Sequence, residues 1–581
     1  MPNIRLILWG VLAALLFLNY QTWVHDYETA PPAAQTAGTQ SSGAPANPLG
    51  ESVPQATTLP APNAVAPTTG TVSGATPGTA PAIAPTATAT PGAAAPADAA
   101  PSAPIRITTD VLDIEINLKG GELDRADLLQ YPLRKDTPNI PVRLLSDEPP
   151  PTLYLLQSGL TGPAGETTPT HLAIWTASEK KYVLAPGVNE LRVPMTWSDG
   201  QGLRVTKTFV FTRGQYSIGL YYDVNNESGA ARKLASYSQF LRHWEHASRS
   251  YFDVESYSFK GPAVYDGTKS KDLNVESDSD AKYSATITNG WLASLQHQFV
   301  SAIVPAAGQP YQYQLRVVGS EYLISATGPE VEVPASAKIQ FHEQLFVGPK
   351  LQSQLAAMGR NLERTVDFGV LTVVAQPLFT GLNWVHKILG NWGWSIVVVT
   401  ALIKLVFFPL SQASGRSMAK MRAVGPRMKQ IQETFKDDRE KLGRAMMELY
   451  KKEKINPLAG CLPMVVQIPV FISFYRVLLE SVEMRQAPFL LWINDLSSRD
   501  PFFVLPLLMG GAMFAQFKLN PAPPDPMQAK IMQFMPLVMT GMMAWFPSGL
   551  TLYWLTNTVL SIAQQWRVNQ VVEKEAAKQR S

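Results

Sequence analysis

The sequence predicts a multi-domain α + β membrane protein with six transmembrane helices and one large antiparallel β domain. Three observations lead to this prediction. Residues 105–350 show the two-residue hydrophobic period of strands. The chain after residue 350 changes to a helical period with long apolar runs, and basic residues concentrate in one loop between those runs. A chain of 581 residues has room for both a soluble domain and a helical bundle.

The chain begins with an apolar segment. Residues 6–18 are apolar, follow Arg5, and are closed by Tyr20 and Trp23. A cleaved signal peptide also has one cation before a short apolar core, but the bulky residues after this core do not form a small-residue cleavage site. Tyr20 and Trp23 are typical of an interfacial anchor. We therefore expect residues 1–24 to be an uncleaved signal-anchor helix.

Residues 25–104 are expected to form a disordered linker. From residue 29 to residue 104 the chain is almost entirely Ala, Pro, Thr, Gly and Ser, without Lys or Arg, and Glu51 and Asp98 are its only charges. A segment of this composition cannot bury enough apolar surface to offset the conformational entropy lost in folding.

Residues 105–350 are expected to form a large antiparallel β-sandwich. Apolar and polar residues alternate from 112 to 119, and Gly120 and Gly121 then provide a turn. Residues 205–211 and 216–224 alternate in the same way on either side of a short segment centred on Gly214, which is typical of a β-hairpin.

After residue 350 the hydrophobic period is helical. Residues 351–392 are expected to contain an amphipathic helix at the membrane surface, because polar side chains are mixed into the apolar run 371–389. Five apolar runs then predict spans: 394–410, 462–480, 502–517, 531–546 and 550–565. The corresponding regions are a second transmembrane helix (393–411), a basic helical hairpin (412–460), transmembrane helices three to six (461–567) and a tail (568–581).

The distribution of Lys and Arg predicts the orientation. The segment 411–460 contains twelve of them, whereas the loop 481–500 contains only Arg485 and Arg499. Basic loops stay in the cytoplasm. We therefore expect the hairpin, both termini and the tail to be cytoplasmic, and the β domain to be periplasmic, in a bacterial inner membrane.

The sequence offers no convincing enzyme site. It contains no Gly-rich phosphate loop or nucleophile elbow, and its single cysteine, Cys461, excludes a thiolate metal cluster. His243 and His246 do not have the spacing of a zinc-binding helix motif. We expect no catalytic residue, no metal and no cofactor.

Lys404 is the unusual residue of the predicted spans. A cation near the centre of a bilayer costs roughly 2.5–3.5 kcal/mol on insertion scales. One interpretation is that the long side chain of Lys404 reaches the cytoplasmic interface. The other is a polar binding groove, because Thr400 lies one turn away on the same helix face and further polar residues interrupt later spans. The latter are Gln467, Ser473 and Asn557, together with Thr556 and Gln564.

The basic hairpin carries apolar stripes rich in methionine. Their three- and four-residue spacing predicts two amphipathic helices, the second beginning near Asp438. The methionines could fill a seam between these helices. Alternatively they form a flexible, polarisable surface for varied apolar segments or for the ribosome. The candidate contact residues are Met418, Met421, Met428, Met446 and Met447.

Six short segments of the chain form a pattern that is highly specific in its order and spacing. They are 417–421 (SMAKM), 456–463 (NPLAGCLP), 467–469 (QIP), 485–489 (RQAPF), 525–527 (DPM) and 545–550 (WFPSGL). Together they resemble the YidC/Oxa/Alb family of membrane protein insertases. The N-terminal anchor, the linker and the β domain resemble the Gram-negative branch of that family, so that the resemblance covers nearly the whole chain.

The resemblance implies a fold and a site. The β domain would be a β-supersandwich, and the five later spans would form an insertase core with a hydrophilic groove open to the cytoplasm and to lipid. Lys404 stands where many members have Arg, and Thr400 and Gln467 match groove-lining positions. Trp554 stands where relatives often have a tyrosine, so that this position lacks a hydroxyl. The expected groove residues are Lys404, Thr400, Gln467, Ser473, Trp554 and Asn557.

The resemblance also implies a function that is not enzymatic. The chain would insert and fold integral inner-membrane proteins as an insertase and chaperone, alone or with the Sec translocon. Expected partners are nascent inner-membrane proteins, the Sec translocon and membrane lipids, with the ribosome and the signal-recognition-particle pathway as further candidates, and no DNA.

Two other functions remain as alternatives. A solute channel would need polar residues through the whole bilayer, and internal repeats are usual in transporters. A membrane-tethered periplasmic carbohydrate-binding or carbohydrate-modifying protein would explain the β domain. It would leave the basic hairpin and Lys404 without a role.

Overall fold

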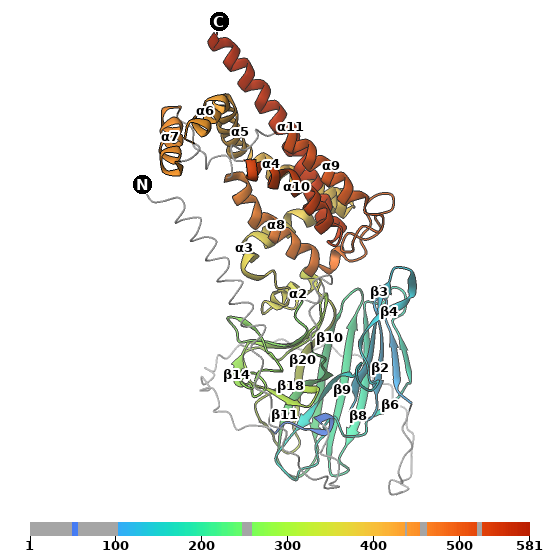
Figure 1. Ribbon diagram of the computed structural model, residues 1–581. Coiled ribbons are helices and arrows are strands. Elements are labelled where there is room, and N and C mark those ends of the chain that lie inside the picture. Colours follow the sequence, from blue (N-terminus) through green and yellow to red (C-terminus); the bar gives the residue numbers. More distant parts are fainter. Residues whose placement is uncertain are drawn as a thin grey trace, which may run out of the picture. The chain divides into compact units, whose positions relative to one another are not determined.

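The computed structural model describes residues 49–55, 103–246, 258–435, 438–453, 462–519 and 526–580. The predicted anchor at residues 1–24 and most of the predicted linker lie outside these ranges. Within them, strands occupy residues 105–349 and helices dominate the rest of the chain (Figure 1).

The described strands form two sheets. The larger one has eleven strands. Nine of them follow one another in the order β14 (Ser284–Thr288), β17 (Pro310–Val318), β18 (Glu321–Thr327), β11 (Arg232–His243), β5 (Tyr154–Thr161), β3 (Glu122–Arg134), β2 (Leu112–Asn117), β1 (Ile105–Thr108) and β7 (Lys181–Val183). The other two are β19 (Val331–Val333), which pairs with β11, and β4 (Thr137–Leu145), which pairs with β3.

The smaller sheet has nine strands. Their order is β13 (Ser270–Asp272), β12 (Gly261–Tyr265), β15 (Trp291–Leu295), β16 (Phe299–Val304), β20 (Lys338–Pro349), β10 (Ser217–Asn226), β9 (Leu203–Thr212), β8 (Glu190–Ser198) and β6 (Thr176–Ala177). The two-residue pattern correctly predicted these strands where it was clearest. β2 alternates buried and half-buried residues throughout, and β9 and β10 pair as a hairpin with Ile218 opposite Phe211.

One strand pair departs from the expected antiparallel sheet. β1 pairs with β2 in the antiparallel sense but with β7 in the parallel sense. The chain between β1 and β7 passes through β2 to β6 before it returns. A long connection of this kind permits parallel pairing, whereas a short hairpin does not. Sequence alternation is the same in both cases, so the prediction could not separate them.

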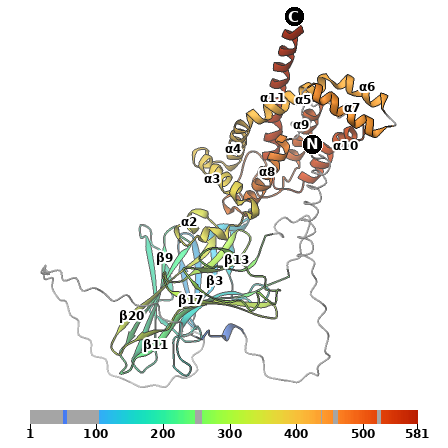
Figure 2. The same cartoon turned by 90° about the vertical axis from the view of Figure 1, so that its left-hand side faces the viewer.

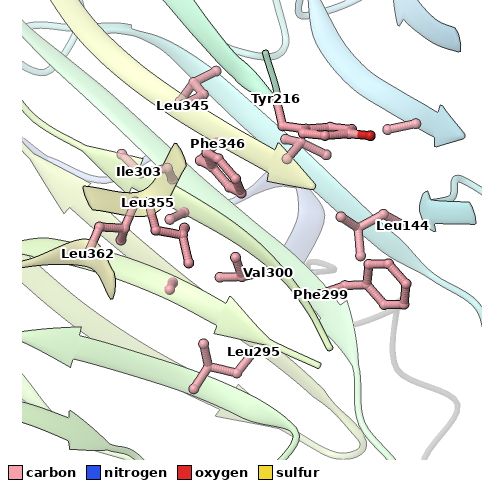
Figure 3. Close-up of a cluster of buried hydrophobic side chains, with 14 of the residues drawn as sticks. Leu144, Tyr216, Leu295, Phe299, Val300, Ile303, Leu345, Phe346, Leu355 and Leu362 are labelled. Atoms are coloured by element: carbon pink, nitrogen blue, oxygen red, sulfur yellow. The ribbon is translucent and has the colours of Figure 1, made fainter. Parts of the chain in front are cut away.

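The two sheets face each other across the core. Ser236 and Ser238 of β11 each donate a hydrogen bond to Glu343 of β20, at 2.8 and 2.6 Å. Leu355 and Leu362 belong to the same buried apolar cluster as Val300 and Phe346 of the smaller sheet (Figure 3). The core of the domain is therefore continuous through both sheets.

Residues 49–55 correct one part of the expected linker. They are ordered, with a short 3-10 turn, η1 (Leu49–Glu51), beside the larger sheet (Figure 2). Leu49 packs against Leu241 and Leu323. Composition predicted disorder because one leucine among small residues is a weak signal. The prediction was wrong here because the leucine and the turn backbone bind to a surface formed elsewhere in the chain.

The helical part contains the following elements: α2 (Gln352–Ala357), η3 (Leu362–Thr365), η4 (Gly369–Leu371), α3 (Thr372–Leu389), α4 (Trp392–Val406), α5 (Phe408–Ala423), α6 (Gly425–Thr434), α7 (Arg439–Lys452), α8 (Leu462–Glu480), η6 (Val482–Met484), α9 (Val504–Leu519), α10 (Pro526–Met543) and α11 (Ser548–Arg580). Two boundaries follow from local chemistry. Gly390 ends α3 in the left-handed conformation, and the Asn391 side chain accepts a hydrogen bond from the Trp394 amide at the start of α4.

The clearest departures from the predicted helix bounds are at the end of α4 and at the end of α11. The run expected as one span at 394–410 is broken at Phe407, and the axes of Trp392–Val406 and Phe408–Ser417 differ by 62°. Pro409 explains the break, because a proline is favoured at the start of a helix and disrupts one from within. In contrast, α11 continues through the expected tail to Arg580 because no Gly or Pro follows Gly549 to end it.

Helix length and hydropathy identify one combined candidate for a membrane span. Among the described helices, none is by itself both long enough and apolar enough. The bent pair formed by Trp392–Val406 and Phe408–Ser417 satisfies both conditions together, and Val504–Leu519 is a shorter apolar helix.

Candidate functional site

A pocket lies among α4, α5, α8 and α11 and contains Lys404. It encloses about 440 Å³, part of which is open to the outside. Its wall is mixed in character. Polar side chains are Thr400, Lys404, Ser411, Gln467, Tyr553 and Asn557, and apolar ones are Ile403, Phe407, Leu410, Val466 and Val470.

Lys404 is half-buried and directs its ammonium group toward α11. Its Nζ donates a hydrogen bond to Ser561 Oγ at 2.7 Å. Ser561 Oγ in turn donates to the Asn557 carbonyl, also at 2.7 Å. In the described part of the chain, no acidic side chain forms an ion pair with Lys404. An ammonium group has three donors, so this lysine has hydrogen-bonding capacity that the serine does not use.

Other polar side chains of the pocket are fixed by local contacts. Thr400 is buried, and its Oγ1 donates to the Ile396 carbonyl one turn back, at 2.6 Å. Tyr553 is buried against Phe474, with the rings stacked 4.5 Å apart. Tyr553 and Gln467 both line the pocket. The pocket wall is therefore partly polar and partly apolar.

The structure brings four of the six candidate groove residues together. Lys404, Thr400, Gln467 and Asn557 all line the pocket. The other two are not among its lining residues. Ser473 is fully buried, and its Oγ has no hydrogen-bond partner among the described residues. Trp554 packs edge-on against Phe471, with ring centroids 4.7 Å apart.

Sequence reasoning missed Tyr553, Ser561 and Ser411 as neighbours of Lys404. A usable signal was present in α11. Tyr553, Asn557 and Ser561 recur every four residues, which places their hydroxyl and amide groups on one helix face. Ser411 could not be found in this way, because it lies beyond the break between α4 and α5.

The apolar surroundings of the pocket are unusually exposed. Leu402, Leu405 and Val406 of α4, and Ile468 and Ile472 of α8, are each more than 40% exposed. Several large apolar side chains of α9 and α10 are exposed as well, including Leu507, Phe534 and Leu537. Contiguous exposed apolar surface of this extent is typical of contact with a membrane or another apolar partner. The pocket therefore combines a cation with a route along apolar helix faces.

The hairpin methionines are mainly internal. Met428 of α6 is buried with Val424 and Leu449, and Met421 and Met446 pack partly buried around them. Met447 is 46% exposed, and the Met418 side chain lies outside the described residues. The seam predicted as one of the two interpretations is therefore present, and Met447 is the candidate that faces outward. α7 begins where expected, with the Asp438 carboxylate capping the Glu440 and Lys441 amides.

No metal set is apparent in the described part of the chain, since no three His, Cys, Asp or Glu side chains come together there. His246 forms an ion pair with Glu276 near the surface. The site chemistry available to the described residues is thus hydrogen bonding, charge and apolar contact.

Two family descriptions match this chain. Residues 104–381 match "YidC periplasmic domain", and residues 384–575 match "60Kd inner membrane protein". A protein of Thioalkalivibrio sulfidiphilus named "Membrane protein insertase YidC" is 44% identical over 100% of both chains. A protein of Pseudomonas putida with the same name is 46% identical over 83% of this chain and 87% of its own length.

A solved structure is also similar. It is titled "Active YidC insertase crystal structure with the first transmembrane domain resolved", and the match covers 80% of this chain and 92% of that one, with 16% identity and a TM-score of 0.36. The assignment rests on the sequence matches, which extend over the whole chain at more than 40% identity. The chain therefore belongs to the YidC family of membrane protein insertases.

Proposed function

We propose that this chain inserts and folds integral membrane proteins, and that the Lys404 pocket receives polar segments of its clients. Family membership supports an inner-membrane insertase with a periplasmic domain, and does not favour a carbohydrate-modifying enzyme. The single observation that points to the pocket is Lys404 itself. Its Nζ has one hydroxyl partner, and exposed apolar helix faces begin next to it.

The proposed mechanism requires no bond chemistry. A client's polar tail or short loop enters the pocket, where Lys404, Gln467 and Asn557 replace part of its hydration. This lowers the cost of placing polar groups at membrane depth, where they would otherwise lack partners. The client's apolar helix then contacts the exposed side chains of α4, α8 and α9 and passes into lipid. Client hydrophobicity and the membrane potential supply the driving force.

We also propose the topology and the partners. Six spans, with a cytoplasmic hairpin, cytoplasmic termini and a periplasmic β domain, are supported by the charge distribution and by the exposed apolar faces of α4, α8, α9 and α10. Nascent inner-membrane proteins are the clients. The Sec translocon, the ribosome, the signal-recognition-particle pathway and membrane lipids are proposed partners, and Met447 is the proposed outward contact of the hairpin.

The topology can be tested with single cysteines in a Cys461→Ser background. Lys441→Cys in α7 should react with a membrane-impermeant maleimide only after the cells are opened. Glu227→Cys, an exposed position in the β domain, should react in intact spheroplasts. Reaction of Lys441→Cys in intact spheroplasts would overturn the orientation.

Substitutions of Lys404 test the pocket. Lys404→Arg should retain insertion because the charge is kept. Lys404→Ala should reduce insertion of a single-span client with an acidic tail by about tenfold, and should spare strongly hydrophobic clients. Lys404→Glu should be worse than Ala for acidic tails, because like charges repel in a site of reduced dielectric. The measurement is protease protection of several clients after depletion of the host's own insertase.

The matched control is Lys387→Ala in α3, where the lysine is exposed. This variant should insert all clients normally. If the Lys404 side chain only reaches the membrane interface, a different result is expected. All three Lys404 variants would then insert every client at the rate of the unaltered chain. Equal activity of the Ala and Glu variants on the acidic-tailed client would remove Lys404 from the mechanism.

A further inference from the structure

The docked turn at residues 49–52 occupies the outer face of the larger sheet. On β11, Ser236 and Ser238 point toward the facing sheet, where both donate to Glu343. Successive residues of a strand point to opposite faces, so Tyr237, Gln239 and Leu241 lie on the outer face. Leu49 packs there against Leu241 of β11 and Leu323 of β18, and it is only 7% exposed.

Side chains of this face bind the backbone of the turn. The Gly50 carbonyl accepts hydrogen bonds from His171 Nε2 at 2.9 Å and from Gln157 Nε2 at 3.3 Å. The Ser52 carbonyl accepts one from Gln239 Nε2 at 3.2 Å. The Ser52 hydroxyl accepts a further hydrogen bond from Arg316. Two carbonyls and one hydroxyl of a four-residue segment are thus recognised by four side chains.

The donors are also held by hydrogen bonds among side chains of the β domain itself. Gln239 also donates to Gln157 Oε1 at 2.8 Å, which orients both amides. His171 Nδ1 lies 2.6 Å from the Tyr237 hydroxyl, which also accepts from the His171 amide. The hydroxyl therefore donates to Nδ1 and leaves the proton on Nε2, facing the Gly50 carbonyl. With the turn docked, Gln157, His171 and Gln239 are each at most 3% exposed, and the carbonyls of the turn satisfy donors in this buried contact.

We propose that this face is a binding site for a short peptide segment, with residues 49–52 of the same chain as its resident occupant. Donors directed at the carbonyls of Gly50 and Ser52, beside an apolar contact surface for Leu49, select a peptide by its backbone and one side chain. The proposal concerns the β domain alone and does not depend on the insertase mechanism.

Occupancy changes the effective length of the predicted linker. From the end of the predicted anchor at residue 24 to the first sheet residue, Ile105, the chain has about 80 residues, but only about 25 up to Leu49. The effective concentration of tethered groups falls roughly as the −3/2 power of linker length. For the flexible linker that the sequence predicts, docking at Leu49 corresponds to an increase of about sixfold in the concentration of the predicted anchor around the β domain.

Disulfide trapping in the full-length chain tests this site. Ser52→Cys and Arg316→Cys, in a Cys461→Ser background, replace the exposed contact and keep Leu49 and Gly50. A site-specific protease sequence is placed near residue 79. After oxidation and cleavage, the N-terminal fragment should remain covalently attached to the β domain. Pairing Ser52→Cys with Arg204→Cys on the smaller sheet should give no attachment.

Two substitutions in the turn distinguish docking from chance encounter. Leu49→Asp should reduce the rate of trapping by about tenfold or more, because it removes the buried apolar group. Glu51→Ala, at an exposed position, should leave the rate unchanged. Leu49 lies outside both sheets, and resistance of the β domain to proteolysis confirms that each variant is folded. Equal trapping rates for Leu49→Asp and the parent pair, or equal trapping at Arg204→Cys, would overturn the proposal.

Discussion

The β domain and the helical part each place a lysine among apolar side chains, and the two lysines differ in their hydrogen-bond partners. Lys207 in β9 is fully buried, and its Nζ donates to the carbonyls of Gly120, Gly121 and Ser158 at 3.2, 2.7 and 3.0 Å. The rings of Trp175, Phe209 and Tyr222 lie within 6 Å of this nitrogen.

Lys404 has a single hydroxyl partner within the described residues, and it lines a pocket. An ammonium group has three donors, so those of Lys207 are all used and those of Lys404 are not. The difference shows how to separate a structural cation from one available for binding. Lys207 is fully buried with all three donors used, whereas Lys404 is half-buried with one hydroxyl partner among the described residues.

The largest expected effect on stability comes from replacing Lys207, whose three donors are all used. Lys207→Met keeps the side-chain length but leaves three buried carbonyls without their donor. We expect a loss of about 3–5 kcal/mol in the free energy of unfolding of the β domain. Denaturant titration monitored by tryptophan fluorescence measures it, with Lys338→Met at an exposed position as the control. A loss no larger than that of the control would show that Lys207 is not structural.

In the helical part, the close packing of α9 against α10 can be tested at a glycine. A Cβ added at Gly510 in α9 would lie 2.0 Å from Thr540 Oγ1 of α10, whereas one added at Gly511 meets nothing within 4 Å. Small residues let helices approach closely in this way. We expect Gly510→Ala to destabilise the helical part by about 1–3 kcal/mol. Gly511→Ala should be neutral or slightly stabilising. Thermal unfolding in detergent compares them, and equal melting temperatures would contradict the close approach.

A smaller effect concerns pH and the β domain. Burial, followed by the charge of Glu122, raises the pKa of Asp124 to about 7. Between pH 4 and 7 the folded chain then keeps a proton that the unfolded chain has released, so stability falls as pH rises through this window. Asp124→Asn should remove that fall, so that the variant is more stable than the unaltered chain at pH 8 and little changed at pH 4.

Unfolding titrations at several pH values measure the Asp124 effect. Asp136→Asn, at an exposed position, is the matched control and should keep the pH slope of the unaltered chain. An identical slope for Asp124→Asn and the unaltered chain would refute the assignment.

Elements with a local cause were predictable from sequence. The alternation in β2 and the hairpin around Gly214 depend on residues adjacent in the chain, and so do the α8 bounds and the Asp438 cap. Thr400 and Lys404 share the pocket for the same reason, because they are one helical turn apart, whereas Gln467 and Asn557 reach it from α8 and α11 through the packing of the helices.

Features that depend on distant residues were not predictable. The parallel pairing of β1 with β7 and the docking of Leu49 are decided by surfaces that form only after folding. Ser473 was chosen because it is polar and lies in an apolar run. Its burial away from the pocket depends on the rotation of α8, which the sequence pattern of that helix does not set.

The break at Phe407 has a mechanical consequence for the pocket. Lys404 lies three residues before the break, while Phe407, Leu410 and Ser411 line the same pocket at or beyond it. The start of α5, from which the hairpin continues, therefore forms part of the pocket wall. A change in the 62° angle would move three wall residues and leave Lys404 and Thr400 in place on α4. The shape of the pocket beside Lys404 therefore depends on the angle at this break.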